Sequence, residues 1–213
     1  MEAISDYYIY GDGERICYVI AGEKATEELS LHFPDTTFVL LEISDWDRFL
    51  SPWKMENPFQ RREAFRGEGD VTLSELLSVI PEVEKNRKYR SRSLIGYSMG
   101  GLFALWASTR TDLFDSVSSV SGSLWFKGLK DYLTLNRIHA ERIYLSLGKK
   151  EKKSSSPVIS TVEEKTKEIF SLLSSQSYFI EYKEEEGGHF DNEGQRLINA
   201  VSFLEGKIDC RRL

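Results

Sequence analysis

Residues 93–105 read SLIGYSMGGLFAL, and this stretch decides the fold that the sequence predicts. An apolar, strand-like run ends at Gly96, and a run of small and apolar residues typical of a buried helix begins at Gly101. Between them, Gly96-Tyr97-Ser98-Met99-Gly100 fits the pattern Gly-x-Ser-x-Gly, in which a serine occupies a sharp turn from strand to helix. So short a pattern also arises by chance, and the strand and helix on either side carry the interpretation.

This turn prepares the serine for nucleophilic chemistry. Because Gly96 and Gly100 lack Cβ atoms, strand and helix can approach closely while Ser98 takes a strained backbone conformation and projects its hydroxyl. The N–H of Met99 then lies at a helix N-terminus, where it can donate to an oxyanion with the help of the helix dipole. We interpret Ser98 as a nucleophile and Met99 as an oxyanion donor. The alternative is a glycine-rich turn that holds a buried serine.

A serine hydroxyl needs a base, and the sequence offers three histidines: His32, His139 and His189. His189 lies in the loop Gly187-Gly188-His189-Phe190, between the last predicted strand and the last predicted helix. It also follows Ser98 in the chain, which is the order that this kind of site uses. We therefore predict His189 as the base, and His32 and His139 as surface or packing residues.

The third member of such a site is an acid that follows a strand between the serine and the histidine. Glu151 comes shortly after the strand predicted for Arg142–Leu147 and is our candidate. It also belongs to the lysine-rich run 149–153, which is typical of a solvated loop. Asp191 and the run Glu184–Glu186 are alternatives, and a site with only serine and histidine is another.

Loops at strand ends supply the remaining candidates. A second oxyanion donor is expected from a backbone N–H after the third strand, at Asp45 or Trp46. We expect Trp53, Trp125 and Tyr97 to wall the substrate pocket, with Trp46 beside them. Core packing is the alternative for the tryptophans.

Elsewhere, short β-rich segments alternate with stretches of helical period, which predicts a mainly parallel central sheet flanked by helices. Tyr7–Tyr10 and Ile16–Ile20 flank the turn at residues 11–13 and predict a hairpin at the sheet edge. Ser44–Asp70 predicts a long, functional loop with at most a short helix. The helical spacing over 73–81 either continues past its proline or kinks there.

Composition restricts the function. The 213 residues suffice for a single α/β-hydrolase domain over 1–213 with little or no cap. The net charge of −6 argues against a nucleic-acid partner, and we read Arg61-Arg62 with Arg66 as a solvated loop. Only Cys17 and Cys210 are present, and neither a secretory leader nor a membrane-spanning run is visible. We expect a cytoplasmic protein without a membrane partner, metal or cofactor.

From about Phe38 onward, the chain resembles one family of α/β-hydrolases. The residues that carry the resemblance are Asp45-Trp46, Ser51-Pro52-Trp53, Gly67-Glu68-Gly69, GYSMGGLFAL at 96–105, VSGSLW at 120–125 and Gly-Gly-His-Phe at 187–190. This family groups esterase D, feruloyl esterases, siderophore esterases and the antigen 85 mycolyltransferases. The resemblance implies a nucleophile at Ser98, a base at His189, an acid at the position of Glu151 and a small-molecule ester substrate.

We therefore expect a serine esterase that forms an acyl-enzyme on Ser98 and releases it with water activated by His189. An acyltransferase that uses an alcohol in place of water is one alternative, and a catalytically inactive binding protein on the same fold is another. Neither the natural ester nor the oligomeric state has a signature in the sequence. The little room for a cap predicts activity on dissolved short to medium esters without interfacial activation.

Overall fold

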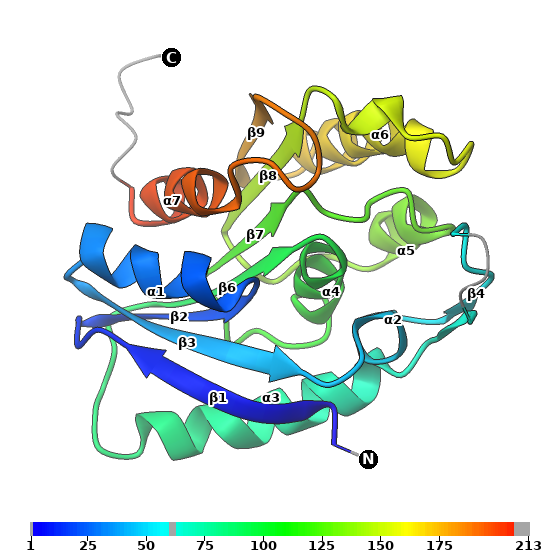
Figure 1. Ribbon diagram of the computed structural model, residues 1–213. Helices are drawn as coiled ribbons and strands as arrows, with labels where there is room; N and C mark the ends of the chain where they lie inside the picture. The colour runs from blue at the N-terminus through cyan, green and yellow to red at the C-terminus, as the bar shows by residue number, and fades with distance from the viewer. Residues whose placement is uncertain (1, 60–62, 207–213) are drawn as a thin grey trace.

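The computed structural model describes residues 2–59 and 63–206 and contains a seven-stranded sheet between two layers of helices (Figure 1). The strand order is β1-β3-β2-β6-β7-β8-β9, and every neighbouring pair is parallel except β1 with β3. The strands of this sheet are β1 (Ile4–Tyr10), β2 (Arg15–Ile20), β3 (Thr36–Ile43), β6 (Arg92–Tyr97), β7 (Ser116–Val120), β8 (Arg142–Gly148) and β9 (Phe179–Glu185). A separate antiparallel pair consists of β4 (Lys54–Met55) and β5 (Phe65–Arg66). The predicted α/β architecture is confirmed.

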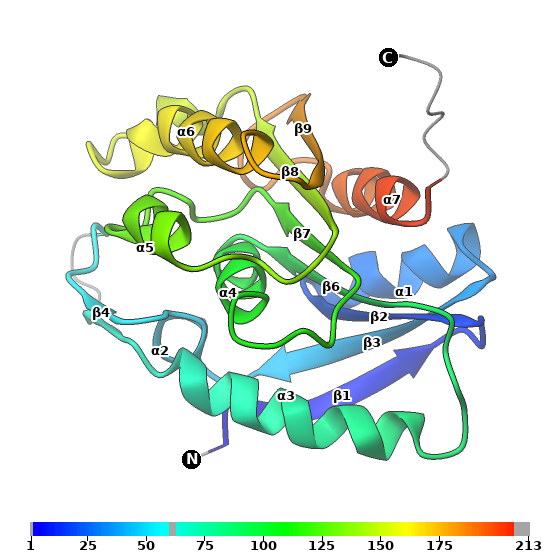
Figure 2. The ribbon, with the colours of Figure 1, turned by 180° about the vertical axis from the view of Figure 1, so that it is seen from behind.

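Helices cover both faces of the sheet (Figure 2). On one face lie α1 (Glu23–His32) and α7 (Glu193–Leu204), which contact each other. On the other face lie α3 (Gly69–Glu84), α4 (Met99–Ala107), α5 (Leu129–Leu135) and α6 (Val162–Ser174), and the short α2 (Trp46–Phe49) follows β3. Within the described segments, no helix has both the length and the apolar character that a membrane crossing requires.

The central strands are buried on both faces because successive side chains point into opposite helix layers. In β2, Tyr18 and Ile20 belong to the apolar cluster that contains α4, whereas Cys17 and Val19 pack in the cluster formed with α1 and α7. Every residue of α4 is buried. This helix therefore lies at the centre of the molecule, where its first turn has a fixed position.

The structure corrects the predicted hairpin. β3 lies between β1 and β2, antiparallel to the first and parallel to the second. The glycine turn at residues 11–13 instead packs closely against the backbone of the residues that begin β3. A Cβ on Gly13 would lie only 1.9 Å from the carbonyl carbon of Asp35.

The sequence prediction missed helix α1 and part of the regular structure between residues 44 and 70. The sequence pattern does not predict α1, because only Thr26 and Leu29 of its ten residues are buried and its apolar period is weak. The predicted long loop over 44–70 contains α2, β4, β5 and the start of α3. Helix α3 continues past Pro81 to Glu84.

The carboxyl ends of the parallel strands lie along one edge of the sheet. The crossover from β2 to β3 runs toward one side of the sheet, and those from β6 through β9 run toward the other. The boundary between β2 and β6 is therefore a switch point, where open α/β sheets bind ligands at the carboxyl ends of their strands. The loops after β3, β6, β7, β8 and β9 meet there and contain the predicted site residues.

Candidate active site

Ser98 occupies the turn between β6 and α4. Its φ of 56° and ψ of −120° are a strained conformation for a residue other than glycine. Its N–H donates to the Val120 carbonyl and its own carbonyl accepts from the Ser123 N–H, each at 3.0 Å. These bonds tie the turn to the end of β7. The half-buried Ser98 side chain lines a cavity.

Two glycines allow this turn to form. A Cβ on Gly96 would lie 1.9 Å from the Gly100 carbonyl oxygen, and a Cβ on Gly100 would lie 2.7 Å from the Ile20 carbonyl oxygen. Both distances are shorter than real Cβ contacts. A larger residue at Gly96 would force β6 and α4 apart, and one at Gly100 would force α4 away from β2.

His189 reaches Ser98 from the loop after β9. Its Nε2 is 3.0 Å from Ser98 Oγ, and its Nδ1 is 2.7 Å from Glu151 Oε2. The Tyr97 hydroxyl donates to the backbone carbonyl of His189 at 2.5 Å, and the two rings lie 5.7 Å apart. Hydrogen bonds thus hold His189 both at its ring and at its backbone.

Glu151 lies behind His189, in a 3-10 turn (Glu151–Lys153) that follows β8, and its side chain is only 4% exposed. Its Oε1 accepts from the Gly148 N–H at 2.8 Å and from Arg196 Nη1 at 2.9 Å. Burial alone would raise the pKa of this carboxyl. The hydrogen bonds and charge of His189 and the Gly148 N–H outweigh burial and hold the pKa of Glu151 below its ordinary value. At neutral pH Glu151 is therefore a carboxylate.

The competing acids have other partners. Asp191 is exposed, and its carboxylate accepts from the Gly188 N–H at 2.7 Å, which closes the turn before His189. It does not cap α7, because the N-cap of that helix is Asn192. The remaining candidates Glu184, Glu185 and Glu186 contact Lys167, Tyr144 and Lys149, respectively. The structure brings Glu151 to the histidine ring.

The two sides of the predicted oxyanion hole also lie at this cavity. Met99 is the first residue of α4 and lines the cavity, and an N–H at this helix position has no acceptor within the helix. Trp46 lines the cavity from the start of α2. The side chain of Asp45 instead caps α2 by accepting from the Arg48 N–H at 3.0 Å.

The cavity at Ser98 has a volume of about 530 Å³, and five aromatic residues contribute to its walls. The aromatic residues that line it are Trp46, Phe59, Phe65, Trp125 and Phe190. Lys150 and Lys153 lie at its rim, and neither makes an ion pair with the residues that the structure describes. The cavity thus combines aromatic residues with the polar side chains of the site, and two lysines lie at its rim.

Two predicted pocket residues lie outside this cavity. Tyr97 is buried, and its hydroxyl donates to the backbone carbonyl of His189. Trp53 packs against Phe126 and Tyr132, and its Nε1–H donates to the Lys127 carbonyl at 2.9 Å. Trp125 does line the cavity. Neither Tyr97 nor Trp53 therefore lines the cavity at Ser98.

The sequence prediction missed three aromatic wall residues. Phe190 was identifiable as the direct neighbour of His189, and it is 92% exposed at the cavity. Phe59 and Phe65 come from the segment between α2 and α3. Their positions depend on the path of that segment over the sheet edge, which has no local signal.

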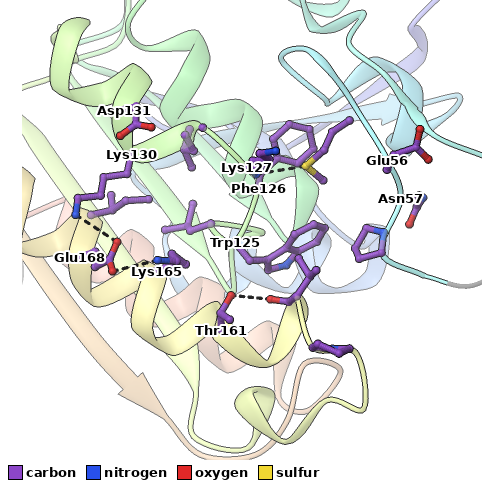
Figure 3. Close-up of a pocket in the computed structure, with 18 of the residues that line it drawn as sticks. Glu56, Asn57, Trp125, Phe126, Lys127, Lys130, Asp131, Thr161, Lys165 and Glu168 are labelled. Atoms are coloured by element: carbon purple, nitrogen blue, oxygen red, sulfur yellow. Dashed lines mark hydrogen bonds and ion pairs between the residues drawn. The ribbon is translucent and has the colours of Figure 1, made fainter.

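Figure 3 shows a second cavity, which has a volume of about 1020 Å³. Trp125 lines both cavities. Its ring contacts Phe59 and Phe65, which line the cavity at Ser98, and also Phe126, which lines the second one. The rim of the second cavity contains Lys130 and Lys165, both paired with Glu168.

The remaining candidates lie apart from this site. His32 and His139 are exposed, as expected of surface residues. Cys17 is buried and burial raises the pKa of its thiol, which makes it a poor nucleophile. Arg66 pairs with Glu63. Arg61, Arg62 and Cys210 lie outside the described residues.

The hydrogen-bonded chain at this sheet edge has a defined chemical capacity. A histidine in contact with a carboxylate can take the proton of a serine hydroxyl while the carboxylate stabilises the imidazolium that forms. Proteins that build this arrangement around a strand-to-helix elbow on a largely parallel sheet are α/β-hydrolases. The fold assigns the protein to that class.

Comparison with known proteins narrows the class. A family model described as "Putative esterase" matches residues 12–194, so the chain belongs to this esterase family and is a carboxylic ester hydrolase. Among curated proteins it is similar to YbbA of Bacillus subtilis (strain 168), an uncharacterized protein. The two are 27% identical over a match that covers 79% of this chain and 74% of YbbA.

Solved structures share the fold at low sequence identity. An IroE-like serine hydrolase from Shewanella oneidensis has a TM-score of 0.79 and 16% identity, over 93% of this chain and 74% of that one. The siderophore hydrolase EstA from Aspergillus nidulans has a TM-score of 0.73 and 20% identity, over 93% of this chain and 84% of that one.

Proposed function

We propose that the protein is a serine esterase that acts through an acyl-serine intermediate. Ser98 is the nucleophile, His189 is the general base, and Glu151 orients the imidazole and stabilises its charged form. The observation that carries the proposal is the continuous chain from Glu151 Oε2 through both ring nitrogens of His189 to Ser98 Oγ, with distances of 2.7 and 3.0 Å.

The reaction proceeds in two displacements. Ser98 Oγ attacks the ester carbonyl while His189 Nε2 takes the hydroxyl proton, and the carbonyl oxygen becomes an oxyanion. The Met99 N–H and a backbone N–H at Asp45 or Trp46 stabilise that oxyanion. Collapse of the intermediate breaks the ester C–O bond, and His189 returns the proton to the leaving alkoxide. A water molecule, deprotonated by His189, then releases the acid and restores the Ser98 hydroxyl.

The substrate is a small-molecule ester whose reacting part fits the aromatic-walled cavity of about 530 Å³. The structural neighbour EstA is named a siderophore hydrolase, so siderophore esters belong in the substrate panel beside simple acyl esters. Product analysis in the presence of an added alcohol separates hydrolysis from acyl transfer. Hydrolysis yields the free acid, whereas transfer yields a new ester.

We further propose that the chain forms one domain in the cytoplasm. The apolar clusters on the two faces of a single sheet include residues from both helix layers, which supports one folding unit. The low cysteine content supports a reducing compartment.

A fluorophosphonate probe tests the nucleophile. We expect one covalent adduct per chain, mapped to Ser98 by peptide mass spectrometry and absent from the Ser98→Ala variant. The variant should lose about four to six orders of magnitude in kcat, because the nucleophile itself is gone, and keep its melting temperature. An adduct on another residue, or no adduct on folded protein, would overturn the assignment. His139→Ala, at an exposed histidine that does not line the cavity, is the matched control and should react normally.

A further inference from the structure

Arg196 is a buried cation directly behind the site, with only 1% of its side chain exposed. It extends from α7, and its Nη1 donates to Glu151 Oε1 at 2.9 Å and to Ser121 Oγ at 2.5 Å. Its Nη2 donates to the backbone carbonyls of Glu186 at 2.9 Å and Gly188 at 2.7 Å. One guanidinium therefore contacts the proposed acid and the loop that leads to the proposed base.

We propose that Arg196 is a positioning residue of this esterase, which fixes the Glu151 carboxylate and the His189 loop relative to each other. This inference rests on the proposed function, because it assigns Arg196 a role that is exerted through Glu151 and His189. The role of Arg196 is additional to the roles of those two residues.

The need for such a residue follows from the topology. The acid follows β8 and the base follows β9, so their relative position depends on how two separate loops meet. Backbone bonds from the Lys149 and Lys150 N–H groups to the carbonyls of Glu185 and Gly187 join these loops. Arg196 binds the carbonyls on either side of Gly187 and completes the junction.

An arginine suits this position better than a lysine. A guanidinium presents several N–H donors in a rigid plane, so it can serve a carboxylate and two carbonyls at once, whereas an ammonium acts as a point charge. Burial of an unpaired charge is costly, and the contact with the Glu151 carboxylate offsets that cost. A variant that removes only one member of the pair leaves the other charge buried without its partner.

Arg196 also adjusts the charge that His189 faces. The groups around the imidazole are Glu151 on the β8 loop, Tyr97 on β6 and Asp191 on its own loop, with Lys150 and Lys153 at the cavity rim and Arg196 behind Glu151. Without the guanidinium, the negative charge of Glu151 is less compensated and stabilises the imidazolium more strongly. The enzyme would then need a higher pH to hold its base in the neutral form.

Four variants test the inference: Arg196→Lys, Arg196→Met, Glu151→Gln and the double variant Glu151→Gln/Arg196→Met. We expect Arg196→Met to lower kcat about 100-fold and to change KM less than about threefold. In the pH profile of kcat/KM, the acidic limb should move about one unit toward higher pH. Arg196→Lys keeps the charge, so it should lower kcat about tenfold and leave the limb in place. The double variant removes both charges, and its kcat should fall little below that of Glu151→Gln alone, because Arg196 aligns the His189 loop with a carboxylate that this variant no longer has.

Arg142→Met is the matched control. Arg142 also binds α7, by donating to the Phe203 carbonyl at 2.7 Å, but it lies at the opposite end of β8. We expect this variant to lose stability and to keep kcat and the pH profile. A purely structural role for Arg196 would give the same result in its own variants.

The inference is overturned if Arg196→Met, or Arg196→Lys where the methionine variant does not fold, keeps the wild-type kcat and acidic limb. It is also overturned if the kcat losses of Glu151→Gln and Arg196→Met multiply in the double variant. Ser98→Ala separates this failure from that of the proposed function. If Ser98→Ala stays active, the proposed function fails; if it is inactive while the Arg196 variants behave as wild type, only the inference fails.

Discussion

Glu151 uses its two carboxylate oxygens for different partners. Oε2 meets His189 Nδ1, while Oε1 accepts from the Gly148 N–H and Arg196. A glutamine has nearly the same shape, but it carries no charge and replaces one acceptor oxygen with a donor. At this position it cannot accept from both sides.

We therefore expect Glu151→Gln to lower kcat about 10²- to 10⁴-fold, because the imidazole loses its orientation and its counter-charge. Asp191→Asn is the comparison, since that carboxylate contacts the loop backbone and not the ring. It should cost less than about tenfold. Steady-state kinetics on both variants, each checked for folding by circular dichroism, measure the difference. Full activity of Glu151→Gln with loss in Asp191→Asn would reverse the assignment, and full activity of both would indicate a site of serine and histidine alone.

The same residue makes stability depend on pH. The pKa of Glu151 in the folded protein lies below its ordinary value of 4.5, so the unfolded chain takes up this proton first as the pH falls. The contribution of Glu151 to stability is present above about pH 4.5 and is lost as the pH falls through the lowered pKa. Urea unfolding between pH 7 and pH 3 should show the wild type losing free energy of unfolding more steeply than Glu151→Gln. Parallel curves for the two proteins would contradict this.

The residues of the site differ in how far the sequence could predict them. Ser98 was predictable because the elbow is built from neighbours in the chain, and His189 because its loop and chain order are local features. Glu151 shares a run with four exposed lysines, and only the fold shows that it alone turns inward. Arg196 was not identified, because nothing local distinguishes a buried arginine in an amphipathic helix from an exposed one.

At the scale of elements, the loop after β9 contains two adjacent glycines with different requirements. Gly187 has a φ of 91°, and a Cβ there would lie 2.6 Å from Asp191 Cβ. Gly188 needs no positive φ, and the nearest atom to its added Cβ would be Asp191 Oδ2 at 3.6 Å. The first glycine is required by backbone conformation and space, and the second is not.

We expect Gly187→Ala to lower both kcat and the melting temperature, since an L-residue in this region costs about 1–2 kcal/mol and would push Asp191 from the turn. Gly188→Ala should keep both properties close to wild type. Thermal unfolding and steady-state kinetics on the pair check the contrast. Equal damage from the two substitutions would mean that the loop is constrained by something other than the conformation of Gly187.

At the scale of the whole molecule, alternating strands and helices predict the class of fold but not the order of the strands. The edge strand β1 pairs with β3, more than 25 residues further along the chain, and a glycine turn after β1 is compatible with a hairpin as well. Burial distinguishes the observed strand order from the hairpin. Because β3 is apolar on both faces, it favours a position inside the sheet, with a strand on each side. That requirement is a property of the assembled sheet.

The assembled sheet edge also places two cavities side by side, with Trp125 between them. Trp125 is mostly buried and its ring packs against aromatic residues of both cavities. The cavity at Ser98, of about 530 Å³, is the smaller of the two. We expect the indole to limit the size of the ester group that the cavity accepts.

Trp125→Ala should therefore raise the ratio of kcat/KM for 4-nitrophenyl octanoate to that for the acetate, because the longer acyl chain gains access to the adjoining cavity of about 1020 Å³. The substitution also removes a large buried side chain and costs about 3–5 kcal/mol of stability, so Trp125→Phe provides a milder variant with a smaller change in the same direction. Trp53→Ala is the matched control, since Trp53 is a partly buried tryptophan that packs on Phe126 but does not line the cavity at Ser98. It should lose stability without changing the ratio. If folded Trp125 variants keep the wild-type ratio, the indole does not limit the acyl group. The acyl chain must then extend toward the open side of the cavity at Phe190.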